Sequence, residues 1–157
     1  MKNLLFLLSF LVLFFAAAQE TPLPDPEGYF SAVIVEDFDN SLNWYIDVLG
    51  FELVNQQASE ARGFQVANLQ RGGVMLEILE LKTALSPKNA IPNFNSKARL
   101  TGIFKTGFFV ANFDGWVKHF KAKEVTFRGN VVTDPESGKK MVIVQDPDGN
   151  RIQFFEK

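Results

Sequence analysis

The sequence contains no cysteine and only one histidine, His119. The lack of cysteine excludes a disulfide, a thiolate metal site, a cysteine nucleophile and a lipid attached to an N-terminal cysteine. A single imidazole cannot form a cluster around a metal ion, and the position of His119 on a predicted outer helix gives little support to a Ser-His-Asp arrangement. We therefore expect His119 to have a surface or helix-packing role.

An excess of basic side chains is also absent. The chain carries 16 basic and 18 acidic residues, and loss of Lys2 with a leader would leave 15 against 18. Nucleic acid is not an expected partner, because phosphate binding requires a basic surface. A phosphate-binding glycine loop and a dinucleotide fingerprint are missing as well. The basic clusters that do occur are typical of a solvated surface.

Residues 1–18 have the features of a secretory signal peptide. Lys2 gives a positive start, residues 4–15 are almost entirely apolar, and the three alanines that follow form a small-residue cleavage site. The apolar run is shorter than the about 20 residues that a membrane span needs. We expect export to the periplasm or the exterior, no stable membrane insertion after cleavage, a new N-terminus at Gln19, and a short extension over residues 19–28.

What the chain does contain is an internal repeat at an offset of 75 residues. The matching positions are Val35-x-x-Phe38-Asp39 with Val110-x-x-Phe113-Asp114, Leu42 with Val117, and Tyr45 with Phe120. We therefore divide the chain into a first repeat over residues 29–81 and a second over residues 105–157.

Each repeat has the pattern of one strand, one helix and three further strands. In the first repeat, Asp39, Asn40 and Ser41 are typical N-cap residues, and Gly50 ends the helix; the second helix is expected to begin near Asp114. The fold class is therefore α+β, with two βαβββ repeats. The predicted strands cover residues 30–35, 52–58, 63–69 and 74–81, and then residues 106–110, 125–132, 140–145 and 151–156.

Residues 82–104 connect the two repeats. They contain Pro87 and Pro92 and few periodic apolar residues, so a long connection is expected. A loop of this length is often a lid or a binding loop. A passive linker is the alternative.

Several motifs occur in a fixed order along the chain: Val35-x-Asp37, Ser41-x-x-Trp44-Tyr45-x-x-x-Leu49-Gly50-Phe51, Leu76-Glu77-Ile78 and Asp146-Pro147-Asp148-Gly149-Asn150-x-Ile152. In order and spacing they resemble the vicinal oxygen chelate superfamily, which includes glyoxalase I, extradiol dioxygenases, fosfomycin-resistance enzymes and bleomycin-resistance proteins. The resemblance covers nearly the whole chain after the leader. It implies a cup-shaped, mostly antiparallel sheet in each half, with the helices outside and the ligand inside.

The resemblance also implies where a metal ion would bind. Metal enzymes of the family use one residue from each of four strands, typically His or Gln, Glu, His and Glu. In this sequence the four positions fall on Phe30, Glu77, Lys105 and Gln153. A phenyl ring cannot donate to a metal and a protonated lysine repels one, so the metal site is degenerate. We predict no cofactor, and a divalent metal is the alternative.

The cation at position 105 suggests what replaces the metal. Strand alternation turns Lys105 and Phe109 to one side of their strand, and likewise Gln153 and Phe155. We hypothesise that the Lys105 ammonium takes the electrostatic part of the metal, paired with Glu77 and hydrogen-bonded to the Gln153 carbonyl. A buried lysine without a partner would be costly or would lose its proton. The alternative is a reactive lysine that forms a Schiff base or acts as a base.

The leading functional prediction is a binding module for a small apolar or amphipathic molecule, as in the bleomycin-resistance members that sequester ligands without a metal. An apolar cavity with a few convergent polar groups is typical of ligand pockets. The alternative is a glyoxalase-like metal-dependent lyase, isomerase or oxygenase; a third option is an assembly unit that forms homodimers. The predicted ligand-binding residues are Phe30, Glu77, Lys105, Phe109, Gln153 and Phe155.

Overall fold

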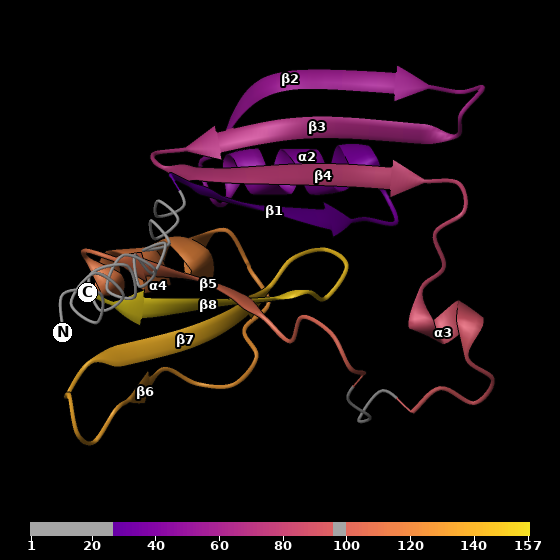
Figure 1. Cartoon of the computed structure of the whole chain (residues 1–157). Helices are drawn as coiled ribbons and strands as arrows, with labels where there is room; N and C mark the ends of the chain where they lie inside the picture. Colours follow the sequence, from indigo (N-terminus) through magenta and orange to yellow (C-terminus); the bar gives the residue numbers. More distant parts are fainter. Residues whose placement is uncertain (1–26, 96–99) are drawn as a thin grey trace, which may run out of the picture.

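The computed structural model describes residues 27–95 and 100–157, so the predicted signal peptide lies outside the described residues. Two four-stranded mixed sheets, each with one ten-residue helix, confirm the predicted α+β fold of two βαβββ units. Figure 1 shows one sheet above the other, with α2 against the upper sheet and α4 against the lower. In the described part of the chain, no helix is long and apolar enough to cross a membrane.

The first sheet has the strand order β1-β4-β3-β2. Strands β1 and β4 are parallel, whereas β4, β3 and β2 pair antiparallel. All four strand predictions agree with the structure to within two residues. The elements are β1 (Tyr29–Ile34), α2 (Phe38–Asp47), β2 (Glu52–Ser59), β3 (Phe64–Arg71) and β4 (Val74–Leu81).

The second sheet repeats this topology in the order β5-β8-β7-β6, again with a parallel outer pair, β5 and β8. The predictions for β5, β7 and β8 match the observed bounds. Between the sheets, the connection over residues 82–104 contains one short helix, α3 (Pro87–Ala90). The elements of the second half are β5 (Thr106–Val110), α4 (Phe113–Ala122), β6 (Val132–Thr133), β7 (Lys140–Gln145) and β8 (Arg151–Glu156).

The predicted strand over residues 125–132 is wrong for most of its length. Phe127 forms only an isolated bridge with Val144, and β6 contains just two residues. The amide of Arg128 still donates to the Ile143 carbonyl at 2.8 Å, but Gly129 then takes a φ of +97°. This left-handed backbone turns the chain away from β7 and interrupts the ladder.

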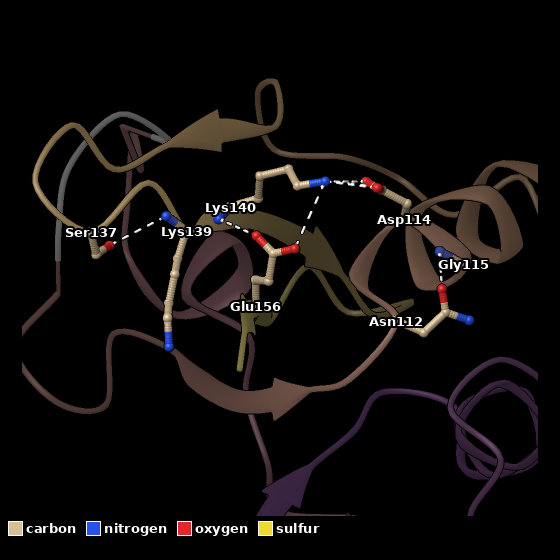
Figure 2. Close-up of polar contacts among 7 residues, drawn as sticks. All are labelled: Asn112, Asp114, Gly115, Ser137, Lys139, Lys140 and Glu156. Carbon is tan, nitrogen blue, oxygen red and sulfur yellow. Dashed lines mark hydrogen bonds and ion pairs between the residues drawn. The ribbon is translucent and has the colours of Figure 1, made fainter.

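The N-cap of the first helix lies earlier than predicted. Asp37 is the cap, and its side chain accepts a hydrogen bond from the Asn40 amide at 3.0 Å. Asn112 stands at the equivalent place in the repeat and accepts from the Gly115 amide at 3.2 Å (Figure 2). Both caps satisfy an amide that the first helical turn leaves without a partner. Asp39, which was predicted as cap material, instead places its negative charge in the first turn.

The hydrophobic core lies between the helices and one face of each sheet, and it continues from one half to the other. Phe120 of α4 packs on Phe154 of β8, with ring centroids 4.8 Å apart. The rings of Phe51 and Phe108, one from each half, meet with centroids 6.3 Å apart. Fully burying a side chain of this kind contributes about 1.5–3 kcal/mol, so this shared core is the main force that joins the halves.

A buried hydrogen bond accompanies this core. Tyr45 of α2 donates its hydroxyl to Asp146 Oδ2 at 2.8 Å, and Asp146, in the turn between β7 and β8, is only 5% exposed. Asn150 adds two donors to this carboxyl and the Asp148 amide adds one. Burial raises the pKa of Asp146, although these hydrogen bonds oppose the shift. Burial also raises the pKa of Tyr45, which therefore stays a donor.

We expect Tyr45→Phe to lower the free energy of unfolding by about 1–3 kcal/mol, because a buried acceptor on Asp146 loses a donor. Urea denaturation at neutral pH measures the loss. Tyr29→Phe, at an exposed tyrosine, is the matched control and should stay within about 0.5 kcal/mol of the native protein. Equal changes in the free energy of unfolding for the two substitutions would show that the Tyr45 hydroxyl does not stabilise the contact between the two halves.

Candidate functional site

Two of the predicted ligand-binding residues lie on the open face of the first sheet. Leu76 and Ile78 of β4 are buried on the side that α2 covers. Glu77, between them, therefore points to the opposite side, where it is half-buried. Phe30 of β1 pairs in register with Met75 and is 65% exposed. The structure thus places Phe30 and Glu77 on the side away from the helix.

The other four lie on the open face of the second sheet. Buried Ile152 and Phe154 on β8 turn Gln153 and Phe155 to the side away from α4. In register, Phe109 of β5 pairs with Phe155, and their rings stack at a centroid distance of 5.2 Å. Phe109 is 75% exposed. This face therefore presents an accessible pair of stacked phenyl rings.

Lys105 precedes β5 and contacts the same face. Its Nζ donates a hydrogen bond to Oε1 of Gln153, as predicted. Gln153 is 3% exposed, and its Nε2 donates to the sulfur of Met141 at 3.1 Å. The oxygen and the nitrogen of the Gln153 amide are therefore both hydrogen-bonded, and the acceptor that holds Lys105 is neutral.

The predicted ion pair between Lys105 and Glu77 is wrong. Within residues 27–95 and 100–157, the salt bridges join Lys82 to Glu60 and Lys140 to two carboxylates, and none includes Lys105 or Glu77. Lys105 is exposed, not buried, so water solvates the end of its side chain and burial does not require a carboxylate partner.

The second sheet does contain a paired lysine, but at the other end of β7. Lys140 Nζ lies 2.7 Å from Asp114 of α4 and 3.9 Å from Glu156 of β8 (Figure 2). Hydrogen bonding to Asp114 raises the pKa of Lys140. This cation joins the first turn of α4 to the two inner strands of the sheet, β7 and β8, which is a structural role.

The residues at the four metal-ligand positions do not fit a divalent ion. Phe30 offers no donor, Lys105 is a cation, and the Gln153 oxygen already accepts from Lys105. Glu77 is the only carboxylate among them. In the described part of the chain, no three His, Cys, Asp or Glu side chains are grouped so that they could hold a metal ion.

Two cavities lie at the junction of the halves, and none of the six predicted residues lines either. The smaller, about 50 Å³, is walled mainly by Leu49, Phe51, Phe108 and Phe154. His119 borders the larger one, and its Nε2 lies 2.8 Å from the Val48 carbonyl oxygen, which is the helix-packing role predicted for it. The larger cavity, about 310 Å³, is lined by Asp47, Val48, Gly50, Arg71, Asn112, Gly115, Trp116 and His119.

Sequence reasoning missed this larger cavity. Trp116 lies on the predicted second helix without belonging to a motif, and Arg71, at the end of β3, belongs to none either. Its residues come from both halves and are separated by up to 72 positions in sequence, from Asp47 to His119. An offset that aligns the repeats does not predict which surfaces of the two repeats meet. The one available signal was a tryptophan and a histidine three residues apart on a helix.

Comparison with known proteins agrees with this fold. The family model described as the Glyoxalase/Bleomycin resistance protein/Dioxygenase superfamily matches residues 29–154. The uncharacterised proteins YaeR of Escherichia coli (strain K12) and YwkD of Bacillus subtilis (strain 168) are 28% and 25% identical over 126 residues, which is 80% of this chain and 92% and 93% of theirs. The crystal structure of SMU.1112c superposes with a TM-score of 0.67 at 28% identity, covering 82% of this chain and 96% of that one.

We expect Glu77→Gln to change the free energy of unfolding by no more than about 0.5 kcal/mol, because no cation in the described part of the chain forms an ion pair with Glu77. Asp146→Asn is the contrasting variant: its carboxyl accepts four hydrogen bonds, so a loss of about 1–3 kcal/mol is expected. Urea denaturation compares the two. A loss of about 3–5 kcal/mol in Glu77→Gln would instead indicate a buried ion pair.

Proposed function

The chain belongs to the Glyoxalase/Bleomycin resistance protein/Dioxygenase superfamily, and we propose that it is an exported member that binds a small apolar or amphipathic molecule without a metal. The observation that carries the proposal is the contact between Lys105 and Gln153, beside the stacked rings of Phe109 and Phe155. Here an organic cation and an amide stand where metal enzymes of the family place two ligands. The donor set therefore favours binding through contact and charge over metal-assisted chemistry.

The open faces have the character of a ligand-binding surface. Phe30 and Phe109 are largely exposed, and Ile34 and Met75 join Phe30 on the face of the first sheet. Exposed apolar patches of this kind commonly mark binding sites, because covering them removes apolar area from water. A ligand laid on these rings would gain about 25 cal/mol for each Å² that it covers.

Polar groups also lie on these faces. On the first sheet, Glu77 is in register with Asn68, whose Nδ2 donates to Asn55 Oδ1 at 2.8 Å. On the second sheet, Lys105 and Gln153 contact each other. A small number of fixed polar groups among apolar ones orients a ligand and adds selectivity. Lys105 has no carboxylate partner among the described residues, so an amphipathic ligand with a polar or anionic end suits this face.

We expect the neutral fluorescent probe N-phenyl-1-naphthylamine to bind the purified protein, and Phe109→Ala to weaken this binding about tenfold. Losing contact with one phenyl ring costs about 1.5 kcal/mol, which corresponds to that factor. Probe fluorescence during titration measures the affinity. Leu85→Ala is the control, because Leu85 is an exposed apolar residue on the connection between the halves.

Two results would contradict the proposal. Equal binding of the probe by Phe109→Ala and the native protein would show that the open face of the second sheet is not the site. Protein purified without chelator that carries one equivalent of a divalent ion, lost in Glu77→Gln, would contradict metal independence. That result would favour the glyoxalase-like lyase, isomerase or oxygenase.

Export is a separate part of the proposal, and it depends on residues 1–18. We expect protein recovered from its native compartment to begin at Gln19, because signal peptidase cuts after small residues such as the alanines at positions 16–18. Intact mass and N-terminal sequencing both measure this. A full-length chain that begins at Met1 would contradict cleavage.

A further inference from the structure

The larger of the two cavities, about 310 Å³, lies where the two halves meet. Its walls come from the end of α2 and the residues that follow it, the end of β3, and α4 with its N-cap. None of the six residues predicted from sequence to bind a ligand lines it. Small-molecule sites favour such junctions between structural units, and this volume is at the lower end of their usual range, about 300–1,000 Å³.

One cation, Arg71, is fixed in the wall of this cavity. Its Nη1 donates a hydrogen bond to the Leu49 carbonyl, and its guanidinium carbon lies 4.7 Å from the centroid of the Trp116 ring. Gly50 leaves room for it, since a Cβ there would come within 3.1 Å of Nη1. The guanidinium is therefore held in one place before any ligand arrives, so little of its conformational entropy remains to be lost on binding.

This cation has spare hydrogen-bonding capacity. A guanidinium has five N–H donors, and within residues 27–95 and 100–157 Arg71 makes one hydrogen bond and no salt bridge. Asp47 also lines the cavity, yet it forms no ion pair with Arg71. Among the described residues, Arg71 is therefore held by a neutral carbonyl and an aromatic ring, and no carboxylate pairs with it.

We propose that this cavity is a second binding site, and that it takes a small carboxylate attached to a flat or apolar group. The guanidinium edge matches the two oxygens of a carboxylate. Val48 and Trp116 supply apolar wall for the rest of the ligand. The Asp47 carboxylate repels anions, and it repels a phosphate dianion more than a monoanion, which favours the carboxylate.

His119 lines the cavity and is held in place by two contacts. Its Nε2 lies 2.8 Å from the Val48 carbonyl oxygen, which can only accept, so Nε2 is the donor in this contact. The ring packs beside Trp116, with centroids 6.1 Å apart. In the proposed site Arg71 is the group that selects the carboxylate. This site is separate from the open sheet faces and does not depend on the function proposed for them.

Benzoate and its neutral analogue benzamide test the proposal on the purified protein. The indole N–H resonance of Trp116 follows binding by NMR. We expect benzoate to bind at least tenfold more tightly than benzamide, and Arg71→Gln to weaken benzoate binding at least tenfold, because a charge-assisted hydrogen bond is lost. Asp47→Asn should strengthen benzoate binding about threefold, since a repelling exposed charge is removed.

Arg62→Gln is the matched control. Arg62 also lies over a ring, 5.1 Å from the centroid of Phe64, but it lines neither cavity. It should leave benzoate affinity unchanged. Equal affinity for benzoate and benzamide, or unchanged affinity in Arg71→Gln, would overturn the proposal. If Arg71→Gln does not fold, two other measurements test the proposal: the affinity for benzoate relative to benzamide, and the gain in benzoate affinity in Asp47→Asn. Inorganic phosphate that binds more tightly than benzoate would overturn the carboxylate assignment.

Discussion

The whole structure depends on the contact between two similar repeats through their helix-covered sides. The hydrogen bond from Tyr45 of the first repeat to the buried Asp146 carboxyl of the second is part of this contact. The equivalent of Tyr45 in the second repeat is Phe120, which packs on Phe154 and needs no hydroxyl. The repeats therefore diverged where they contact each other. Because the helix side of each sheet is used for this shared core, the opposite sheet faces stay open to other molecules.

Hydrophobic alternation and the repeat were sufficient to predict most of the fold. Strands such as β4 and β7 alternate between buried residues and less buried residues on the open face, so their bounds and orientation could be predicted from sequence. Residues 125–132 have the same β-type composition but form almost no ladder, because Gly129 redirects the backbone. The left-handed conformation of Gly129 is set by the tertiary structure, and composition alone does not predict it.

The candidate site was predictable within each sheet but not between sheets. Lys105, Phe109, Gln153 and Phe155 lie on one face because strand register is local, and the structure confirms the contact between Lys105 and Gln153. The predicted pairing of Lys105 with Glu77 was wrong. Testing it required knowledge of how the two sheets are placed and how deeply the lysine is buried, which the sequence does not give. For the same reason Arg71 was not predicted as a site residue, because its contacts with Leu49 and Trp116 involve both repeats.

The acceptors that hold each cation distinguish the structural role of Lys140 from the binding roles that we propose for Lys105 and Arg71. Lys140 lies between Asp114 and Glu156, so its charge is already compensated within the fold. Lys105 and Arg71 are held instead by an amide and a carbonyl, which fix the position of a cation but leave its net charge intact. Arg71 also lies over the Trp116 ring, and Gln153, which accepts from Lys105, shares its face of the sheet with the stacked Phe109 and Phe155. A positioned cation whose charge remains available, next to an apolar surface, suits an amphipathic anion, and the two repeats provide this combination at two separate places.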